Sequence, residues 1–231
     1  MKMLRSSKRR RRPWKRLGTG LAVAGLVASA YRWVFRPWHR TWGAAPDEVQ
    51  RALPGDELVP DPEYETTRAI TIRAPVDAVW PWLAQIGQGR GGFYSYDWLE
   101  NLFGLDIHSV DRVVPAWQHV KTGDTVRMAP PDRFDGNARM EVARVDIDRA
   151  LVLRSPLEAP SDQAAVWAFV LDPIDTSATR LLVRTRLKGP PAFLLLLEPT
   201  HFVMEQKMLR GVKQRAEREA TRRPLAKQPA R

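Results

Sequence analysis

The sequence predicts an α+β fold in which a curved antiparallel sheet wraps around one long C-terminal helix. Two observations carry this prediction. The element order is one strand, two short helices, a run of closely spaced strands and a long amphipathic helix over 201–221. A sheet with one apolar face must also be covered, and this closing helix is the only predicted element long enough to cover it.

The first elements are a strand and a short helix. Residues 64–74 have strand character, with Ile70 and Ile72 on one face of an alternating pattern. Pro75 then occupies a position typical of a helix start. Apolar residues follow at helical spacing: Val76, Val79, Trp80 and Leu83. Because Pro81 lies within the first two turns, we expect this helix to be short or kinked.

A second short helix and five further strands are expected next. The helix is predicted within 93–104, where Trp98, Leu99, Leu102 and Phe103 form an apolar pattern. The strand-like stretches are 124–128, 138–147, 151–155, 165–171 and 179–187. Turn signals rich in Gly, Pro and Asp separate them, and such short connections favour antiparallel pairing.

The last strand and the closing helix each predict two different faces. Arg180, Arg184 and Arg186 share one face of strand 179–187 by period two, and we expect that face to be solvated. In the closing helix an apolar face contains Met204, Met208, Gly211 and Val212. Gly211 is expected to let this helix approach the sheet closely.

Two segments point to a known superfamily. Residues 70–80 read ITIRAPVDAVW and resemble the opening strand and helix of the START/birch-pollen-allergen superfamily, often called SRPBCC. Residues 204–213, MEQKMLRGVK, are similar to its C-terminal helix. The resemblance implies a helix-grip fold with a hydrophobic ligand between sheet and helix. Some members are polyketide cyclases and many have no assigned reaction, so the fold alone does not fix the function.

The charge of the chain divides it into regions. The formal net charge is +11, yet residues 41–204 hold 16 basic and 23 acidic residues, a net charge of −7. The basic excess lies at the two ends, so we expect no nucleic-acid partner. The predicted regions are a basic segment 1–16, a hydrophobic segment 17–36, a polar linker 41–63, a ligand-binding domain 64–221 and a basic tail 222–231.

Three interpretations of the leader stay open. Residues 17–35 are as long as a bilayer core is thick if helical, and nine basic residues precede them. The favoured interpretation is a single-pass anchor with the N-terminus cytoplasmic and the domain outside. The alternatives are a signal peptide cleaved near Ala30 and a basic leader that only touches anionic lipid.

Aromatic and flexible side chains suggest a pocket for a hydrophobic small molecule or lipid. The densest aromatic cluster is 93–98, and either core packing or a pocket wall accounts for it. The candidate ligand-binding residues are Trp82, Arg90, Tyr94, Tyr96, Trp98, His108, Trp117, Trp167, Met204 and Met208. The two methionines suit both core filling and an adaptable cavity.

An enzyme is the competing hypothesis. His108, Asp97 and Asp111 are the weak candidates for acid–base catalysis in a cyclase or dehydratase, and this requires His108 or Asp97 to point into a cavity. A loop-pinning role for His108 is the simpler interpretation. A third hypothesis is an interaction protein without a ligand, which binds its partner through the basic tail.

The sequence gives no support for a metal or a cofactor. Gly87, Gly89 and Gly92 fit the spacing of a dinucleotide fingerprint, but they follow a helix and no βαβ repeat comes after them. We expect a tight joint between two helices there. The four histidines are scattered and the chain has no cysteine, so a metal site and thiol chemistry are not expected.

Overall fold

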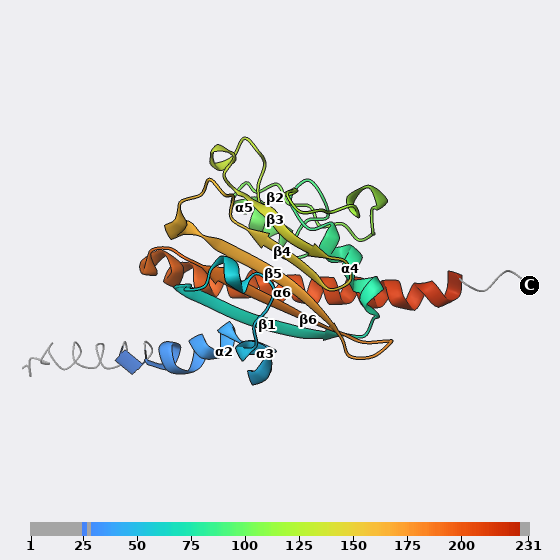
Figure 1. Cartoon of the computed structure of the whole chain (residues 1–231), viewed down its shortest axis with the longest axis horizontal. Coiled ribbons are helices and arrows are strands. Elements are labelled where there is room, and N and C mark those ends of the chain that lie inside the picture. Colours follow the sequence, from blue (N-terminus) through green and yellow to red (C-terminus); the bar gives the residue numbers. More distant parts are fainter. Residues whose placement is uncertain (1–24, 27–28, 227–231) are drawn as a thin grey trace, which may run out of the picture. The chain divides into compact units, whose positions relative to one another are not determined.

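The computed structural model describes residues 25, 26 and 29–226 (Figure 1). It divides into two compact units, Met1–His39 and Arg40–Arg231. In the first unit, the described residues include η1 (Tyr31–Phe35), and α2 (Arg36–Arg40) starts there. The basic segment 1–16 lies outside the described residues, as does much of the hydrophobic segment 17–36. None of the helices within the described ranges has the length and apolar character needed to span a membrane.

The second unit contains one sheet of six strands in the order β1-β6-β5-β4-β3-β2, with every neighbouring pair antiparallel. The strands are β1 (Tyr64–Ile72), β2 (Thr125–Arg127), β3 (Arg139–Asp146), β4 (Ala150–Arg154), β5 (Ala165–Pro173) and β6 (Thr179–Leu187). All six predicted strands are present in the predicted order. The first strand therefore pairs with the last.

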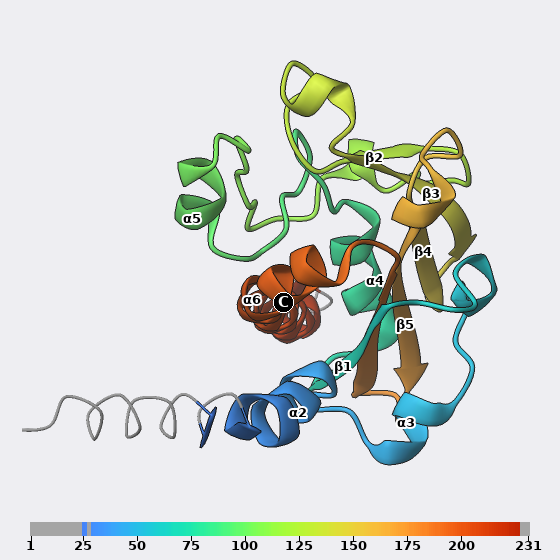
Figure 2. The same ribbon diagram turned by 90° about the vertical axis from the view of Figure 1, so that its left-hand side faces the viewer.

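Two short helices and one long helix accompany the sheet on one side. They are α4 (Val76–Ala84), α5 (Asp97–Leu102) and α6 (Pro191–Ala226). Figure 2, viewed along α6, shows the sheet curving past this helix, with α4 between the two. The α+β prediction is thus confirmed. The shorter elements are α3 (Pro46–Gln50), η2 (Asp56–Leu58), η3 (Pro115–Trp117), η4 (Phe134–Gly136) and η5 (Ser161–Gln163).

The closing helix is longer than predicted. It begins at Pro191 rather than at His201, so the apolar run 193–197 is its first part and not a separate segment. Proline is well tolerated in a first helical turn, where its missing N–H would have no intrahelical partner. Pro191 and Pro199 interrupted the sequence pattern, and the prediction therefore placed the helix start after both of them.

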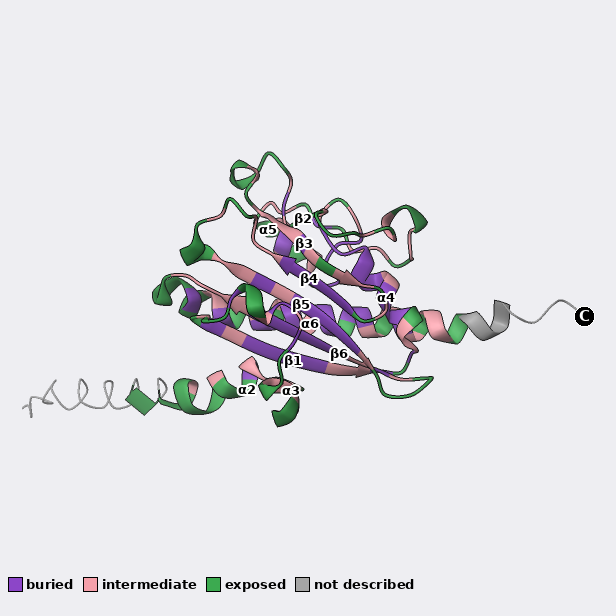
Figure 3. Cartoon of the chain, viewed as in Figure 1, coloured by how far each residue is buried: buried purple, intermediate pink, exposed green. Residues whose placement is uncertain are grey.

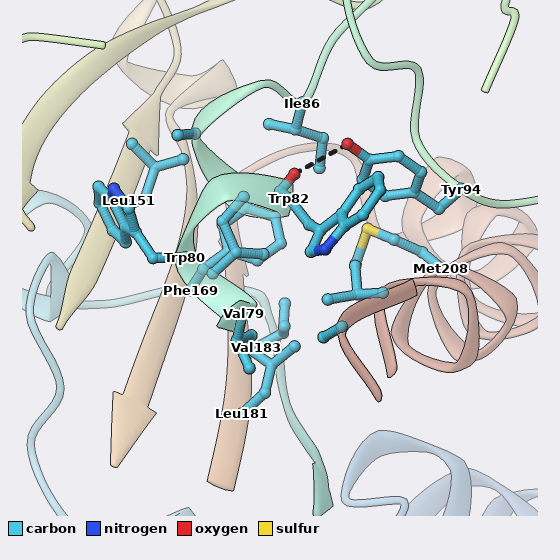
Figure 4. Close-up of a cluster of buried hydrophobic side chains, with 14 of the residues drawn as sticks. Val79, Trp80, Trp82, Ile86, Tyr94, Leu151, Phe169, Leu181, Val183 and Met208 are labelled. Carbon is cyan, nitrogen blue, oxygen red and sulfur yellow. Dashed lines mark hydrogen bonds between the residues drawn. The ribbon is translucent and has the colours of Figure 1, made fainter. Parts of the chain in front are cut away.

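The main core lies between the sheet and the helices α4 and α6. Figure 4 shows part of it: Trp82 and Tyr94 pack edge to face near Phe169 of β5 and Met208 of α6. Trp82, Tyr94 and Phe169 are each at most 1% exposed. The buried positions are concentrated on β1, β4, β5, β6, α4 and the inner side of α6, whereas α5 carries exposed positions (Figure 3). Trp98, Leu102 and Phe103 are exposed, so the apolar pattern expected to bury this helix does not do so.

The opposite face of the sheet is covered by the segment 43–59. Leu53 and Val59 of this segment are buried against strand residues of that face. Arg184 of β6 fastens this segment to the sheet. Its guanidinium donates to Asp56 at 2.6 Å and to the backbone oxygens of Arg51, Glu48 and Val49. The prediction of a solvated arginine face is wrong: the Arg184 side chain is 3% exposed, and those of Arg180 and Arg186, 20% and 15% exposed, are paired with Glu48 and Glu65.

The glycine-rich segment forms a tight joint, as predicted. Gly87, Gly89 and Gly92 all have positive φ, and Gly87 pairs with Gly92 in an isolated antiparallel bridge. The prediction for Gly211 needs correction. A Cβ at this position would lie 2.2 Å from the carbonyl oxygen of Tyr94, so Gly211 lets α6 approach the loop before α5 and not the sheet.

Candidate functional site

A cavity of about 410 Å³ opens between the sheet and the first half of α6. This volume falls within the range of small-molecule sites. The lining residues come from α5, α6, the strands β3, β5 and β6 and the segments beside them: Phe93, Ser95, Glu100, Leu105, Met128, Ala138, Met140, Ala165, Val166, Trp167, Thr185, Leu187, Leu197, Thr200, His201, Met204, Glu205 and Met208. Three methionines from α6 and β3 contribute flexible walls, which suit an adaptable apolar site.

One part of the lining is a buried polar cluster around Glu205. Arg68 Nη1 of β1 donates to Glu205 Oε2 at 2.6 Å, and both side chains are at most 1% exposed. Glu205 Oε1 accepts from Trp167 Nε1 at 3.0 Å and from Thr185 Oγ1 at 3.2 Å. Arg68 also donates to His201 Nδ1 at 3.2 Å. The cluster therefore ties β1, β5 and β6 to α6 with each partner satisfied.

The ionisation states follow from these contacts. Burial opposes the charge on Glu205. The neighbouring Arg68 and the hydrogen bonds that the Glu205 carboxylate accepts outweigh this effect, so the pKa of the carboxyl is lowered overall. Burial lowers the pKa of His201, with Arg68 acting in the same direction and Glu205 against it. Because Arg68 can only donate, His201 Nδ1 is the acceptor and Nε2 carries the proton of the neutral ring. The cluster is an arginine–carboxylate pair beside a neutral histidine.

Glu100 lies in the same lining without such partners. It is 7% exposed, and its Oε2 is buried with no hydrogen-bond partner among the described residues. Burial raises its pKa to about 7, and the Asp97 carboxylate adds to the shift. Helix α5 holds this residue in place through backbone bonds from Glu100 N to Tyr96 O and from Phe103 N to Glu100 O. The cavity thus contains one polar group that the protein itself leaves unsatisfied.

A six-stranded antiparallel sheet that curves around a long C-terminal helix, with a cavity between them, decides the fold. It is a helix grip. No family model matches the sequence, and no curated protein matches it. The assignment of the helix grip rests on the arrangement of the strands and of α6.

Solved structures with similar helix-grip folds share little sequence with this chain. A protein from Thermobifida fusca has a TM-score of 0.46 and 13% identity, over 67% of this chain and 94% of that one. The Aha1 dimer from Colwellia psychrerythraea has a TM-score of 0.41 and 15% identity, over 67% and 96%. The di-domain ARO/CYC protein BexL of the BE-7585A biosynthetic pathway has a TM-score of 0.40 and 12% identity, over 67% and 46%.

Three of the predicted ligand-binding residues line the helix-grip cavity: Trp167, Met204 and Met208. Trp82 and Tyr94 lie in the packed core, where the Tyr94 hydroxyl donates to the Trp82 backbone oxygen at 2.9 Å. Arg90 donates to the backbone oxygens of Ala84 and Trp117 and so fastens the glycine joint. Those residues are outside the cavity lining.

The remaining predicted ligand-binding residues also lie elsewhere. Tyr96 is half-buried under the Lys207 ammonium, whose Nζ lies 5.5 Å from the ring centroid. Trp98 is 69% exposed on α5. Trp117 ends the short helix η3, away from the cavity lining. His108 is exposed and contacts Asp106 at 3.0 Å.

The three acid–base candidates are not brought together at the cavity. Asp97 accepts hydrogen bonds from Ser109 N at 2.7 Å and Ser109 Oγ at 2.6 Å, which fixes the loop after α5. Asp111 pairs with Arg215 at 2.8 Å on the surface. None of the three residues is part of the lining. Among the residues that the structure describes, no cluster of His, Asp and Glu could hold a metal ion.

Sequence reasoning missed Arg68, Glu100, His201 and Glu205. A charged residue inside a strand, such as Arg68 between Thr67 and Ala69, was a usable signal because a buried charge requires a partner. The signal for Glu205 was its position between Met204 and Met208 on the apolar side of α6. For Glu100 no sequence signal was available, since its burial depends on how the loop places α5 over the cavity.

Proposed function

We propose that the protein is a helix-grip module that binds a hydrophobic small molecule, or the acyl part of a lipid, in the cavity between sheet and α6. The supporting observation is the 410 Å³ cavity itself, whose walls are almost all apolar. Burial of apolar ligand surface supplies about 25 cal/mol per Å², so a ligand that fills the space gains affinity mainly from burial. The flexible methionine walls favour a range of shapes over one rigid fit.

Native mass spectrometry of the full-length protein purified from cells tests this proposal. We expect a retained small molecule that dissociates on denaturation and whose mass identifies its class. The variant Ala165→Phe, which places a ring in the cavity, should not retain the small molecule. The control Ala116→Phe adds the same ring at an exposed position outside the lining and should still retain the small molecule. Equal retention by both variants would count against the cavity as the binding site.

The finer part of the proposal is a membrane tether with the binding domain outside the cell. Its support is the sequence: nine basic residues precede the hydrophobic segment 17–35, and two follow it, Arg36 and Arg40. Cell fractionation and protease protection of the tagged protein test this directly. We expect a full-length protein in the membrane fraction whose domain is cut by external protease. A mature N-terminus just after Ala30 would instead identify a cleaved leader.

A further inference from the structure

The cavity lining contains a second carboxyl group, that of Glu100, whose burial no contact within the described residues explains. Its side chain belongs to the lining, is 7% exposed and receives no hydrogen bond or ion pair within the described part of the chain. The other buried carboxylate of the lining, Glu205, accepts three hydrogen bonds and has Arg68 beside it. The two carboxyls therefore differ in their hydrogen bonding: Glu205 is held by its partners from the sheet, and Glu100 Oε2 has none among the described residues.

A buried carboxyl without a partner destabilises the folded protein, because desolvation is not offset by a hydrogen bond. Such groups are uncommon in native proteins and each one calls for an explanation. Glu100 lies on α5, a helix of six residues, and two apolar side chains of this helix, Trp98 and Leu102, are exposed. The packing of α5 therefore does not require an acid at position 100. A ligand atom in the cavity is the partner that the geometry allows.

We propose that Glu100 is the recognition group of the cavity, and that it donates a hydrogen bond to a carbonyl oxygen on an otherwise apolar ligand. This inference rests on the proposed function and names its ligand class: an apolar body with one hydrogen-bond-accepting oxygen. A neutral ligand suits the site, since an ion pair in an apolar cavity has to overcome the desolvation of both charges. The alternative ligand class is an apolar amine, whose ammonium group would form an ion pair with the Glu100 carboxylate.

The charged and titratable groups that face Glu100 support a protonated acid. Asp97, on the same helix, raises its pKa, and burial raises it further, to about 7. Across the cavity α6 contributes His201, which burial keeps neutral, and Glu205, which is already paired with Arg68. No cation of the lining is directed at Glu100 among the described residues. The acid can therefore hold its proton near neutral pH and act as a donor.

Three naphthalenes of similar size test the proposal on the full-length protein by titration calorimetry. They are 2-ethylnaphthalene, 2-acetylnaphthalene and 2-(aminomethyl)naphthalene. We expect the wild type to bind the ketone three- to tenfold more tightly than the hydrocarbon at a pH below 7, which corresponds to one net hydrogen bond. The preference should disappear well above pH 7, because a carboxylate cannot donate. Tightest binding of the amine, strengthening as the pH rises, would overturn the proposal.

Two variants at Glu100 separate the hydrogen bond from packing. Glu100→Gln keeps a donor that does not titrate, so it should prefer the ketone at both pH values. Glu100→Leu should bind ketone and hydrocarbon equally. The control Glu158→Gln changes an exposed acid and should behave as the wild type. If the hydrocarbon binds but the wild type shows no preference for the ketone, the Glu100 proposal fails while the proposed function stands. If neither compound binds, both fail.

Discussion

Arg68 of β1 and Glu205 of α6 form an ion pair of 2.6 Å that is almost completely withdrawn from solvent. The pair joins the first strand to the closing helix, which lie far apart in the sequence. Because Trp167 and Thr185 donate to the other carboxylate oxygen, the charge on Glu205 is compensated from three strands. The polar part of the cavity wall is thereby fixed before any ligand enters.

Removal of one member of this pair should strongly destabilise the protein. We expect Arg68→Met to lower the free energy of unfolding by about 3–5 kcal/mol, because it leaves a buried carboxylate uncompensated. Urea unfolding measures this. The double variant Arg68→Met/Glu205→Leu removes both charges and should recover much of the loss. A control, Asp172→Ala, breaks the exposed pair with Arg51 and should cost less than about 1 kcal/mol.

The stability of the protein should depend on pH through Glu100. The folded pKa of about 7 lies above the ordinary value of 4.5, so this group contributes stability that is fully present below pH 4.5 and lost as the pH rises through 7. We expect Glu100→Gln to gain stability relative to the wild type between pH 4.5 and about pH 8, by at most about 3 kcal/mol. Urea unfolding of the wild type and of Glu100→Gln at pH 4.5 and at about pH 8 measures this difference in the free energy of unfolding. A constant difference between the two proteins would contradict the assigned environment.

Loss of the Arg184 guanidinium should release the segment that covers the outer face of the sheet. Arg184→Met removes the contacts to Asp56 and to three backbone oxygens, and we expect a loss of about 3 kcal/mol. Hydrogen exchange should also rise in 43–59 before it rises in β6. Arg144→Met, which removes an exposed pair with Asp146, is the matched control and should change neither quantity appreciably.

Addition of one methyl group at Gly211 should disturb the packing of α6. The new Cβ would lie 2.2 Å from the Tyr94 carbonyl oxygen, which belongs to the backbone of the loop before α5. Overpacking of this kind costs about 1–3 kcal/mol, which outweighs the gain of about 1 kcal/mol in helix propensity. We therefore expect Gly211→Ala to lower Tm by several degrees in a calorimetric scan. Gln214→Ala, at an exposed position of the same helix, should leave Tm unchanged; an unchanged Tm in Gly211→Ala would contradict the close approach.

The sequence was most informative where a pattern is local. Alternating residues and turn signals predicted six strands, and the boundaries of β6, Thr179–Leu187, agree with the prediction. The apolar stripe of the closing helix also placed Met204 and Met208 toward the sheet, and both line the cavity. These patterns work because strand and helix periodicity decide directly which side chains are buried. Pro191 shows the limit, since proline both begins and interrupts helices.

The candidate site depended on contacts that no local pattern contains. Trp82, Tyr94 and Trp167 are alike in sequence terms, yet two of them pack in the core and one lines the cavity. His108 and Asp97 were two of the three acid–base candidates, but His108 is exposed beside Asp106 and Asp97 accepts a hydrogen bond from Ser109.

The sequence by itself determined the helix-grip architecture, because the order and faces of the strands and helices leave one way to cover the apolar side of the sheet. Only the tertiary structure decided the chemistry of the cavity. Arg68 and Glu205 are 137 residues apart, and their partnership is set by the position of α6 across β1. Glu100 is buried and unpartnered through the fold of one loop, and burial, not residue type, raises its pKa. Long-range packing determines which charges are compensated, and no local sequence pattern records that.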